Sequence, residues 1–248
     1  MSDSSAFVKM RPEPALRRFV EVLWVHRVAG PPPPGGRRLL PDGRVHLVWI
    51  AQLGLRIAGP AQMAMSPPPL DRMLAFGATL YPGVAPYLLR TPASDIVDQH
   101  IHVDAIDGRF AAEVDDALLA APDARAGVAA LQRVLARRIA AVDREPDPAV
   151  RRAVAVLDSA GATVAGAAAA TYVSERELQR RFVHDVGYAP KTLQRVMRLQ
   201  RFLAQLTLPR IELAGAAALA GYADQSHLSR DARRLAGLSP RQLLDYRH

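Results

Sequence analysis

The C-terminal part of the chain carries one polar helical pattern twice, first as Ser174-Glu-Arg-Glu-Leu-Gln-Arg-Arg-Phe182 and, fifty residues later, as Asp224-Gln-Ser-His-Leu-Ser-Arg-Asp-Ala232. Both copies begin with a residue type that accepts the free N–H groups of a helix's first turn, so each predicts a helix start. The copies match at four pairs of positions: Leu178 and Leu228, Arg180 and Arg230, Gly187 and Gly237, and Pro190 and Pro240. Such a duplication is typical of two helix-turn-helix modules in one chain.

Length and composition predict a folded protein of two domains. The chain has 248 residues, and a typical domain has roughly 100 to 150. Half of the residues are apolar, as in folded proteins. It contains no cysteine, which excludes disulfides, thiolate metal sites and cysteine nucleophiles. The N-terminus lacks a basic start followed by an apolar run, and no stretch approaches the ~18 apolar residues of a membrane span. We therefore expect a cytoplasmic protein with no membrane partner.

The charge of the chain is concentrated in its C-terminal part. The formal net charge is +8, and the residues from Pro146 onward, with 15 basic and 9 acidic side chains, carry +6 of it. An asymmetric basic balance is expected of a surface that meets phosphates, although solvated arginine-rich helix faces are common. The charge favours a nucleic-acid partner only in combination with the repeat.

A break in the helical pattern predicts the domain boundary. In Asp143-Arg-Glu-Pro-Asp-Pro148, two prolines and four charged residues separate two helical segments. The stretch divides the chain into an N-terminal domain, residues 1–145, and a C-terminal domain, residues 146–248. The C-terminal domain is predicted to be helical at 149–159, 164–170, 174–185, 192–206, 211–220, 224–236 and 240–246.

The N-terminal domain is predicted to combine strands and helices. Residues 7–60 favour strands, including a hairpin from Arg38 to Ile50 around the turn Pro41-Asp42-Gly43. A further strand is expected at 72–80, helices at 85–89, 108–119 and 124–142, and exposed loops at the proline-rich stretches 31–36 and 66–69. The helix at 124–142 carries an apolar stripe that packs either on its own domain or on a second copy of it: Val128, Leu131, Leu135, Ile139 and Val142.

The polar faces of the two repeated helices are the candidate binding residues. A helix in the major groove of DNA reads base edges with its N-terminal turns, through arginine toward guanine, glutamine toward adenine or phosphate, and hydroxyls toward either. The residues spaced away from the apolar positions are Arg176, Gln179 and Arg180 on the first helix, and Gln225, Ser226, Ser229 and Arg230, with His227 beside them, on the second. The alternative to DNA contact is that these residues form two solvated helix faces with no binding role.

The segment between the two helices has a suitable length for two successive grooves. The connector at 192–206 has fifteen residues, which span about 22 Å as a helix. Together with the bodies of the two recognition helices, this length can hold them about 34 Å apart, one turn of DNA. We therefore expect double-stranded DNA as the partner.

These residues carry a family resemblance. The stretches Gly221-Tyr-Ala-Asp-Gln-Ser-His-Leu-Ser-Arg230 and Arg233-Arg-Leu-Ala-Gly-Leu-Ser-Pro240, with the first copy of the repeat, resemble the DNA-binding domain of AraC-type transcription regulators. The resemblance covers about 100 residues, from 149 to 248. It implies base contacts from the positions just named and phosphate contacts near the start of the connector, at Lys191, Thr192 and Arg195.

The N-terminal domain shows a looser resemblance. Leu39-Leu-Pro-Asp-Gly-Arg44 and the segment 76–84 are similar to the N-terminal domain of one AraC-type subgroup. The resemblance implies a β-rich, cupin-like barrel or sandwich with helices that senses a ligand or pairs subunits. The expected fold class is thus an α+β N-terminal domain followed by an all-α domain with two helix-turn-helix motifs joined by a long helix.

Two positions depart from the family pattern. Tyr172 stands where the family usually has glycine in the first motif's turn, and a left-handed residue other than glycine costs about 1–2 kcal/mol, so that turn is a candidate for reshaping. Ala232 stands where the second recognition helix usually carries phenylalanine, and loss of a buried phenylalanine costs about 3–5 kcal/mol unless neighbours fill the space.

The N-terminal domain contains candidate ligand residues. Trp24, His26, His46 and Trp49 are candidates for a small-molecule pocket, although aromatic residues on strands are more often core. His100 and His102 would point the same way on a strand, as two ligands of a metal site do. No third ligand has an obvious place beside them, so no metal and no cofactor are expected.

Three classes of function compete. The first is a transcription regulator that binds a specific DNA site, with a small-molecule effector, a homodimer and, for an activator, RNA polymerase as further partners. The second is an enzyme, either a cupin-like metal enzyme, which lacks a third ligand, or an alkyl-accepting repair protein, which would need a cysteine. The third is an architectural DNA binder that reads only shape and phosphate. The first is favoured, and the protein is not expected to be an enzyme.

Overall fold

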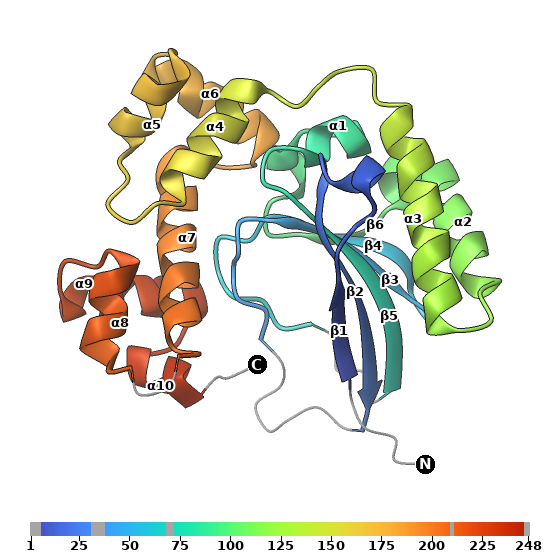
Figure 1. Cartoon of the computed structure of the whole chain (residues 1–248), viewed down its shortest axis with the longest axis horizontal. Helices are drawn as coiled ribbons and strands as arrows, with labels where there is room; N and C mark the ends of the chain where they lie inside the picture. The colour runs from blue at the N-terminus through green and yellow to red at the C-terminus, as the bar shows by residue number, and fades with distance from the viewer. Residues whose placement is uncertain (1–5, 31–37, 68–71, 209–210, 246–248) are drawn as a thin grey trace.

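The protein consists of a sheet-containing N-terminal domain and a helical C-terminal domain (Figure 1). Its structure, a computed structural model, describes residues 6–30, 38–67, 72–208 and 211–245. The predicted loop at 31–36, residues 68 and 69 of the predicted loop at 66–69, and Tyr246 lie outside the described residues. The overall class is α+β, as expected.

The strands of the N-terminal domain form one antiparallel sheet in the order β1-β2-β5-β3-β4-β6. Within the described ranges its edges, β1 and β6, do not pair with each other. The sheet is therefore open, and it is neither the closed barrel nor the two-sheet sandwich that we expected. The strands are β1 (Ala6–Met10), β2 (Val20–Ala29), β3 (Val45–Ile50), β4 (Gly54–Ala58), β5 (Arg72–Leu80) and β6 (His100–His102).

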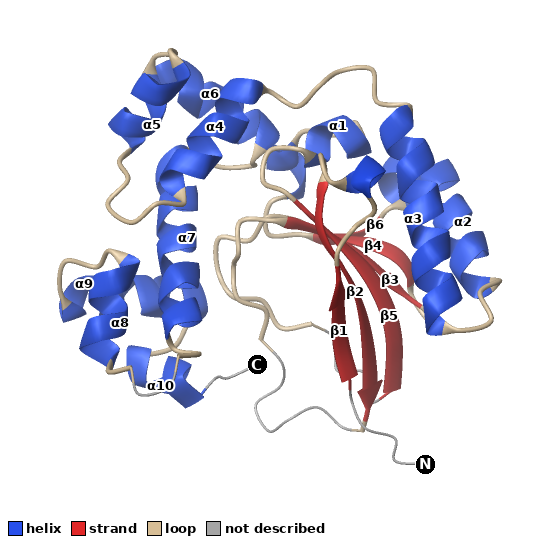
Figure 2. Cartoon of the chain, in the orientation of Figure 1, coloured by secondary structure: helices blue, strands red, loops and turns tan. Residues whose placement is uncertain are grey.

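Helices cover one face of this sheet (Figure 2). The helical segments of the domain are η1 (Pro14–Leu16), α1 (Ala85–Leu89), η2 (Ala93–Ile96), α2 (Asp104–Leu119) and α3 (Ala124–Ala140). The apolar stripe of α3 packs on its own domain, because Leu131, Leu135 and Ile139 are buried with Leu47 and Phe76 in one core. Burial of this stripe decides between the two alternatives that its periodicity left open.

The hairpin predicted at 38–50 is wrong. Strand β3 begins only at Val45 and pairs with β4 and β5. Residues 38–44, which we call the strap, instead reach the C-terminal domain. Leu40 packs against the core of that domain, and the carbonyl of Pro41 accepts a hydrogen bond from Gln200 Nε2 at 2.7 Å. Of the two leucines that suggested a second strand, Leu40 is half-buried by tertiary packing and Leu39 is exposed.

The C-terminal domain is helical throughout its described part, as predicted. The observed helix ends lie within about two residues of the expected ones, except that the predicted segment 224–236 divides into an α-helix and a π-helical turn. The helices are α4 (Pro148–Leu157), α5 (Val164–Thr171), α6 (Glu175–Asp185), α7 (Pro190–Gln205), α8 (Leu213–Ala220), α9 (Gln225–Asp231), the π-helical η3 (Ala232–Ala236) and α10 (Pro240–Asp245).

Helix α7 joins two helix pairs and contributes to the core of each. The pair α5–α6 lies near one end of α7 and the pair α8–α9 near the other (Figure 1). Leu193 and Met197 are buried with Phe182 of α6, whereas Val196, Leu199 and Phe202 are buried with Leu228 of α9. Ala232 is completely buried in this second core, so neighbouring apolar residues occupy the space that a larger side chain would need.

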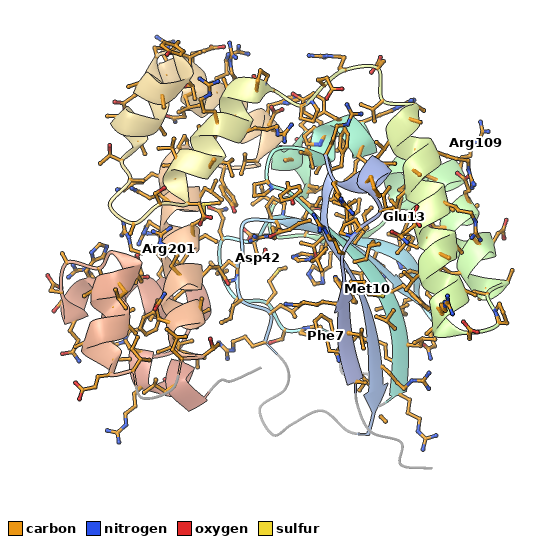
Figure 3. The ribbon with its side chains drawn as sticks, in the orientation of Figure 1. Phe7, Met10, Glu13, Asp42, Arg109 and Arg201 are labelled. Atoms are coloured by element: carbon orange, nitrogen blue, oxygen red, sulfur yellow. The ribbon has the colours of Figure 1, made fainter. Side chains whose placement is uncertain are left out.

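The two domains meet along α7 and α6 and at η3, where the backbone N–H of Ala64 donates to the carbonyl of Leu235 at 2.7 Å. Figure 3 shows Asp42 on the strap, between the sheet and α7. Gly43 of the strap has φ +80°, and a Cβ atom there would lie 2.7 Å from Leu193 Cδ1, so the close approach requires glycine. At the other end, Tyr87 Oη donates to Asp185 Oδ2 at 3.1 Å and accepts from the backbone N–H of Asp147 at 3.0 Å. Burial and the charge of Asp185 raise the pKa of Tyr87 to about 12.

The turns of the two helix pairs have the same backbone conformation. Tyr172 ends α5 with φ +58°, and Gly221 ends α8 with φ +88°. Tyr172 therefore retains the left-handed conformation of the glycine that the resemblance implies, and the turn is not reshaped. The side chain of Tyr172 contributes little burial to offset the strain, since the residue is 89% exposed.

We predict that Tyr172→Gly stabilises the protein, whereas Gly221→Ala destabilises it. Each change alters the cost of one left-handed residue, which is about 1 kcal/mol or more in either direction. A new Cβ atom at position 221 would meet no heavy atom closer than 3.5 Å, so the Gly221 variant reports backbone strain alone. The free energy of unfolding by urea measures both, and changes of the same sign would contradict the assignment.

Candidate nucleic-acid interface

Helix α6 presents three of the predicted contact residues on one exposed face. Its first turn is capped by Ser174, whose hydroxyl accepts from the backbone N–H of Glu177 at 3.2 Å. Leu178 and Phe182 are completely buried, which fixes the rotation of the helix about its axis. Arg176, Gln179 and Arg180 are exposed on the other side.

Glu177 holds two arginines of α6. Its carboxylate accepts from Arg180 Nη2 at 2.7 Å and from Arg181 Nε at 2.7 Å. Arg181 in turn donates to Asp147 Oδ2 at 3.0 Å, in the linker before α4. The hydrogen bonds from Arg180 and Arg181 lower the pKa of Glu177 to about 2. The guanidinium of Arg180 is thereby oriented while it stays exposed.

Helix α9 presents the equivalent face of the second pair. Asp224 caps it by accepting from the backbone N–H of His227 at 2.7 Å, and Leu228 is buried. Exposed or half-buried polar side chains of α9, together with Arg233 of η3, surround a shallow hollow of about 330 Å³. Its lining residues are Gln225, Ser226, Ser229, Arg230 and Arg233. The hollow brings four of the five predicted α9 residues together.

His227 is the fifth of these residues, and it lies partly beneath the exposed face. Its Nε2 accepts a hydrogen bond from Arg198 Nη1 of α7 at 2.7 Å, and its ring meets the Tyr222 ring edge-on at 5.1 Å. Burial and the neighbouring Arg198 charge lower the pKa of His227. The imidazole is therefore neutral at pH 7 and is engaged inside the domain.

The predicted phosphate contacts at the start of α7 differ in their surroundings. Lys191 is exposed and donates to Gln194 Oε1 at 2.8 Å, and Thr192 is half-buried in the first turn. Arg195 points toward α9, where its Nη2 lies 2.7 Å from Asp231 Oδ1. The cationic surface at this end of α7 consequently depends on Lys191 more than on Arg195.

Several residues that organise this surface were not predicted. Asp231 is 1% exposed and receives the Arg195 guanidinium, and Glu177 and Arg181 form the network on α6. The signal was present in the sequence, because positions 177 and 181 correspond to 227 and 231 at the fifty-residue offset and are one helical turn apart.

The four candidate ligand residues of the N-terminal domain do not share one face. Trp49 points into the core beneath α2, where its Nε1 donates to Asp115 Oδ1 at 2.8 Å. Alternation along the strands places Trp24, His26 and His46 on the opposite face. The prediction of one pocket lined by all four residues is therefore wrong. Trp24, His26 and His46 remain together as a candidate ligand surface.

His46 connects that surface to the strap. Its Nδ1 lies 3.1 Å from Thr79 Oγ1, to which Trp24 Nε1 also donates at 3.3 Å, and its Nε2 lies 3.1 Å from Asp42 Oδ2. Burial acts to raise the pKa of Asp42, but the charges and hydrogen bonds of His46 and Arg44 lower it overall. One hydrogen-bonded chain thus links the candidate ligand face to Asp42 of the strap.

The two histidines of β6 differ in their contacts, because the buried Nε2 of His100 has no hydrogen-bond partner whereas His102 contacts an arginine. His102 Nε2 is in contact with Arg56 Nη1, and burial and the charge of Arg56 lower the pKa of His100. Across the ranges that the structure describes, no group of three or more His, Cys, Asp or Glu residues is arranged to hold a metal ion. Those ranges also contain no helix that is long and apolar enough to cross a membrane.

Comparison with protein families assigns both parts of the chain. Residues 167–246 match a family described as a helix-turn-helix domain, and residues 8–102 match one described as a domain of unknown function (DUF6597). The first match confirms the helix-turn-helix domain that the motifs of the C-terminal part predicted. No curated protein matches the chain.

Solved structures with similarity to the chain include two bacterial proteins. The C-terminal domain of AraT, a response regulator from Geobacillus stearothermophilus, is 24% identical, with 41% of this chain and 87% of that chain covered and a TM-score of 0.38. An apo variant of ToxT from Vibrio cholerae is 10% identical, with 95% and 99% covered and a TM-score of 0.49. ToxT with a bound unsaturated fatty acid is 8% identical, with 98% and 96% covered and a TM-score of 0.48.

The Glu177 network predicts an acid titration well below that of an ordinary glutamate. Its folded pKa is depressed to about 2, so the network is intact above the ordinary value and is lost as the pH falls through about 2. We expect the carboxyl ¹³C shift of Glu177 to titrate near pH 2. In Arg180→Ala/Arg181→Ala the midpoint should return toward the ordinary value; an unchanged midpoint would refute the proposed cause.

Proposed function

We propose that this protein is a sequence-specific DNA-binding transcription regulator that inserts α6 and α9 into successive major grooves. The observation that carries the proposal is the equivalence of the two helices. Each follows a left-handed turn, each is capped by a side-chain oxygen, and each exposes polar residues at corresponding positions. A helix-turn-helix domain that presents its second helix in this way uses it to read the major groove.

The length of α7 supports simultaneous binding of both helices. Its sixteen residues span about 24 Å, and the α5–α6 and α8–α9 pairs lie near its two ends. With helix bodies about 10 Å across, a centre-to-centre separation near 34 Å, one DNA turn, is within reach.

The exposed side chains match the chemistry of base edges and phosphates. Arginine pairs with guanine O6 and N7, and glutamine or serine pairs with adenine or with phosphate. We propose base contacts from Arg176, Gln179, Arg180, Gln225, Ser226, Ser229 and Arg230, and phosphate contacts from Lys191 and Thr192. The backbone N–H groups in the first turn of α7 add to the attraction for phosphate.

The N-terminal domain is proposed to control this binding by sensing a small molecule or by pairing subunits. Trp24, His26 and His46 offer aromatic surface and polar atoms on one face of the sheet, and His46 is linked to the strap through Asp42. RNA polymerase is a further partner if the protein activates transcription. The proposed role is binding, and it includes no enzymatic step.

Replacement of Arg230 tests base reading. We expect Arg230→Ala to weaken binding to the selected site by about 1–3 kcal/mol and to relax base preference at the position that it contacts. Arg109→Ala is the matched control, because Arg109 projects from the outer face of α2 in the N-terminal domain (Figure 3). Titration of selected and random duplexes measures both variants. Equal loss on the two DNAs would favour an architectural binder that reads only phosphate and shape.

The use of both helix pairs predicts the extent of the DNA site. Hydroxyl-radical footprinting of the selected duplex should show two protected patches about 10 base pairs apart on one face of the helix. Arg180→Ala should weaken protection in one patch and Arg230→Ala in the other. A single patch that disappears with either substitution would contradict insertion of two helices.

A further inference from the structure

A buried polar cluster lies beneath the second recognition helix. Asp231, at the end of α9, is 1% exposed. Its Oδ1 accepts from Arg195 Nε at 3.0 Å and from Arg195 Nη2 at 2.7 Å. Its Oδ2 has no hydrogen-bond partner and lies 3.7 Å from Arg198 Nη1. Both arginines belong to α7, so the carboxylate of α9 is held between two cations of the connecting helix.

A second contact joins the same two helices one turn earlier. His227 Nε2 accepts from Arg198 Nη1 at 2.7 Å, and its ring packs edge-on against Tyr222. The guanidinium of Arg198 lies over the Tyr222 ring, 5.5 Å from its centroid. Arg195, Arg198, His227 and Asp231 together form what we call the α7–α9 lock.

Within α9 itself, apolar packing comes from a single side chain. The helix has seven residues, and the buried ones are Leu228 and Asp231. A helix this short is not stable by itself in water, so tertiary contacts must set its position. Helix α9 continues directly into η3, whose Ala232, Leu235 and Ala236 are buried in the same core as Leu228. The contacts of Asp231 and His227 with α7 add polar anchors on α9 itself, and their directional geometry fixes which side chains α9 exposes.

The first recognition helix has an ion pair at the equivalent position. Arg181 corresponds to Asp231 at the fifty-residue offset, and its Nη1 lies 3.0 Å from Asp147 Oδ2 at the start of α4. The charges are exchanged between the two ion pairs. In the first helix pair the recognition helix carries the cation, and in the second it carries the anion. The recurrence indicates that this position serves to anchor a recognition helix.

We propose that the α7–α9 lock sets the orientation in which α9 presents its polar face to DNA. Arg195, Arg198, His227 and Asp231 are then positioning residues that act through Gln225, Ser226, Ser229 and Arg230, and Arg195 is not a phosphate contact. The proposal rests on the proposed function. A buried ion pair adds little net stability compared with apolar packing, but loss of one partner leaves the other charge buried and unpaired.

Removal of the negative charge of Asp231 tests the lock, because the lock and the overall charge of the domain predict opposite changes in affinity for the selected DNA site. Loss of an acidic residue from a DNA-facing domain should strengthen binding to any duplex. The lock instead predicts that Asp231→Asn weakens binding to the selected site at least ten-fold while binding to random DNA stays equal or becomes tighter. Glu212→Gln is the matched control, because it removes an exposed carboxylate just before α8.

Substitution of Arg195 distinguishes positioning from phosphate contact without loss of charge. Arg195→Lys retains a cation for a phosphate but cannot give Asp231 two N–H groups from one planar guanidinium. We expect the ratio of specific to random affinity to fall at least five-fold, with the slope of log affinity against log salt unchanged. A ratio equal to that of wild type, or a lower slope on both DNAs, would overturn the lock.

Two measurements keep these outcomes separate. Circular dichroism and retained binding to random DNA establish that each variant is folded. If the wild-type protein itself does not discriminate between selected and random duplexes, the proposed function fails before any variant is compared. If wild type discriminates and Asp231→Asn behaves like Glu212→Gln, the lock fails while the proposed function stands.

Discussion

The packing of α7 against both helix pairs is the constraint on which the C-terminal domain depends. One helix supplies Leu193 and Met197 to the core with α6 and Val196, Leu199 and Phe202 to the core with α9. Because interiors are close-packed, neither pair can shift along or around α7 without loss of these contacts. The separation of the two exposed faces is therefore a property of a single rigid element.

An ion pair anchors each of the helices α6 and α9, but the partner lies in a different element in each case. The anchor of α6 involves Asp147, whose backbone N–H donates to Tyr87 of the N-terminal domain. The anchor of α9 lies entirely within the C-terminal domain, between Asp231 and α7. Helix α6 is thus in direct contact with the domain proposed to sense a ligand, whereas α9 is connected to it through α7, the strap and η3, where the backbone N–H of Ala64 donates to the carbonyl of Leu235 at 2.7 Å.

The interdomain contact explains why one sequence pattern was misleading. Leu39 and Leu40 suggested a strand paired with β3, yet Leu40 packs on the C-terminal core and Leu39 forms an isolated bridge with Met65. Strand propensity reports only that a segment fits a half-buried surface. It cannot say which domain provides that surface. For the same reason the sequence could not decide whether Trp49 lines a pocket or packs in the core, since tryptophan is common in both.

The sequence by itself determined the helix ends of the C-terminal domain, the strand at 72–80 and the polar faces of α6 and α9. These features depend on local signals: caps such as Ser174 and Asp224, prolines, and the spacing of Leu178 and Phe182. Only the tertiary structure decided the open sheet, the position of the strap, and the burial of Asp231 against Arg195. Each of these joins residues from different elements, and the contact of two distant side chains leaves no periodic trace in either segment.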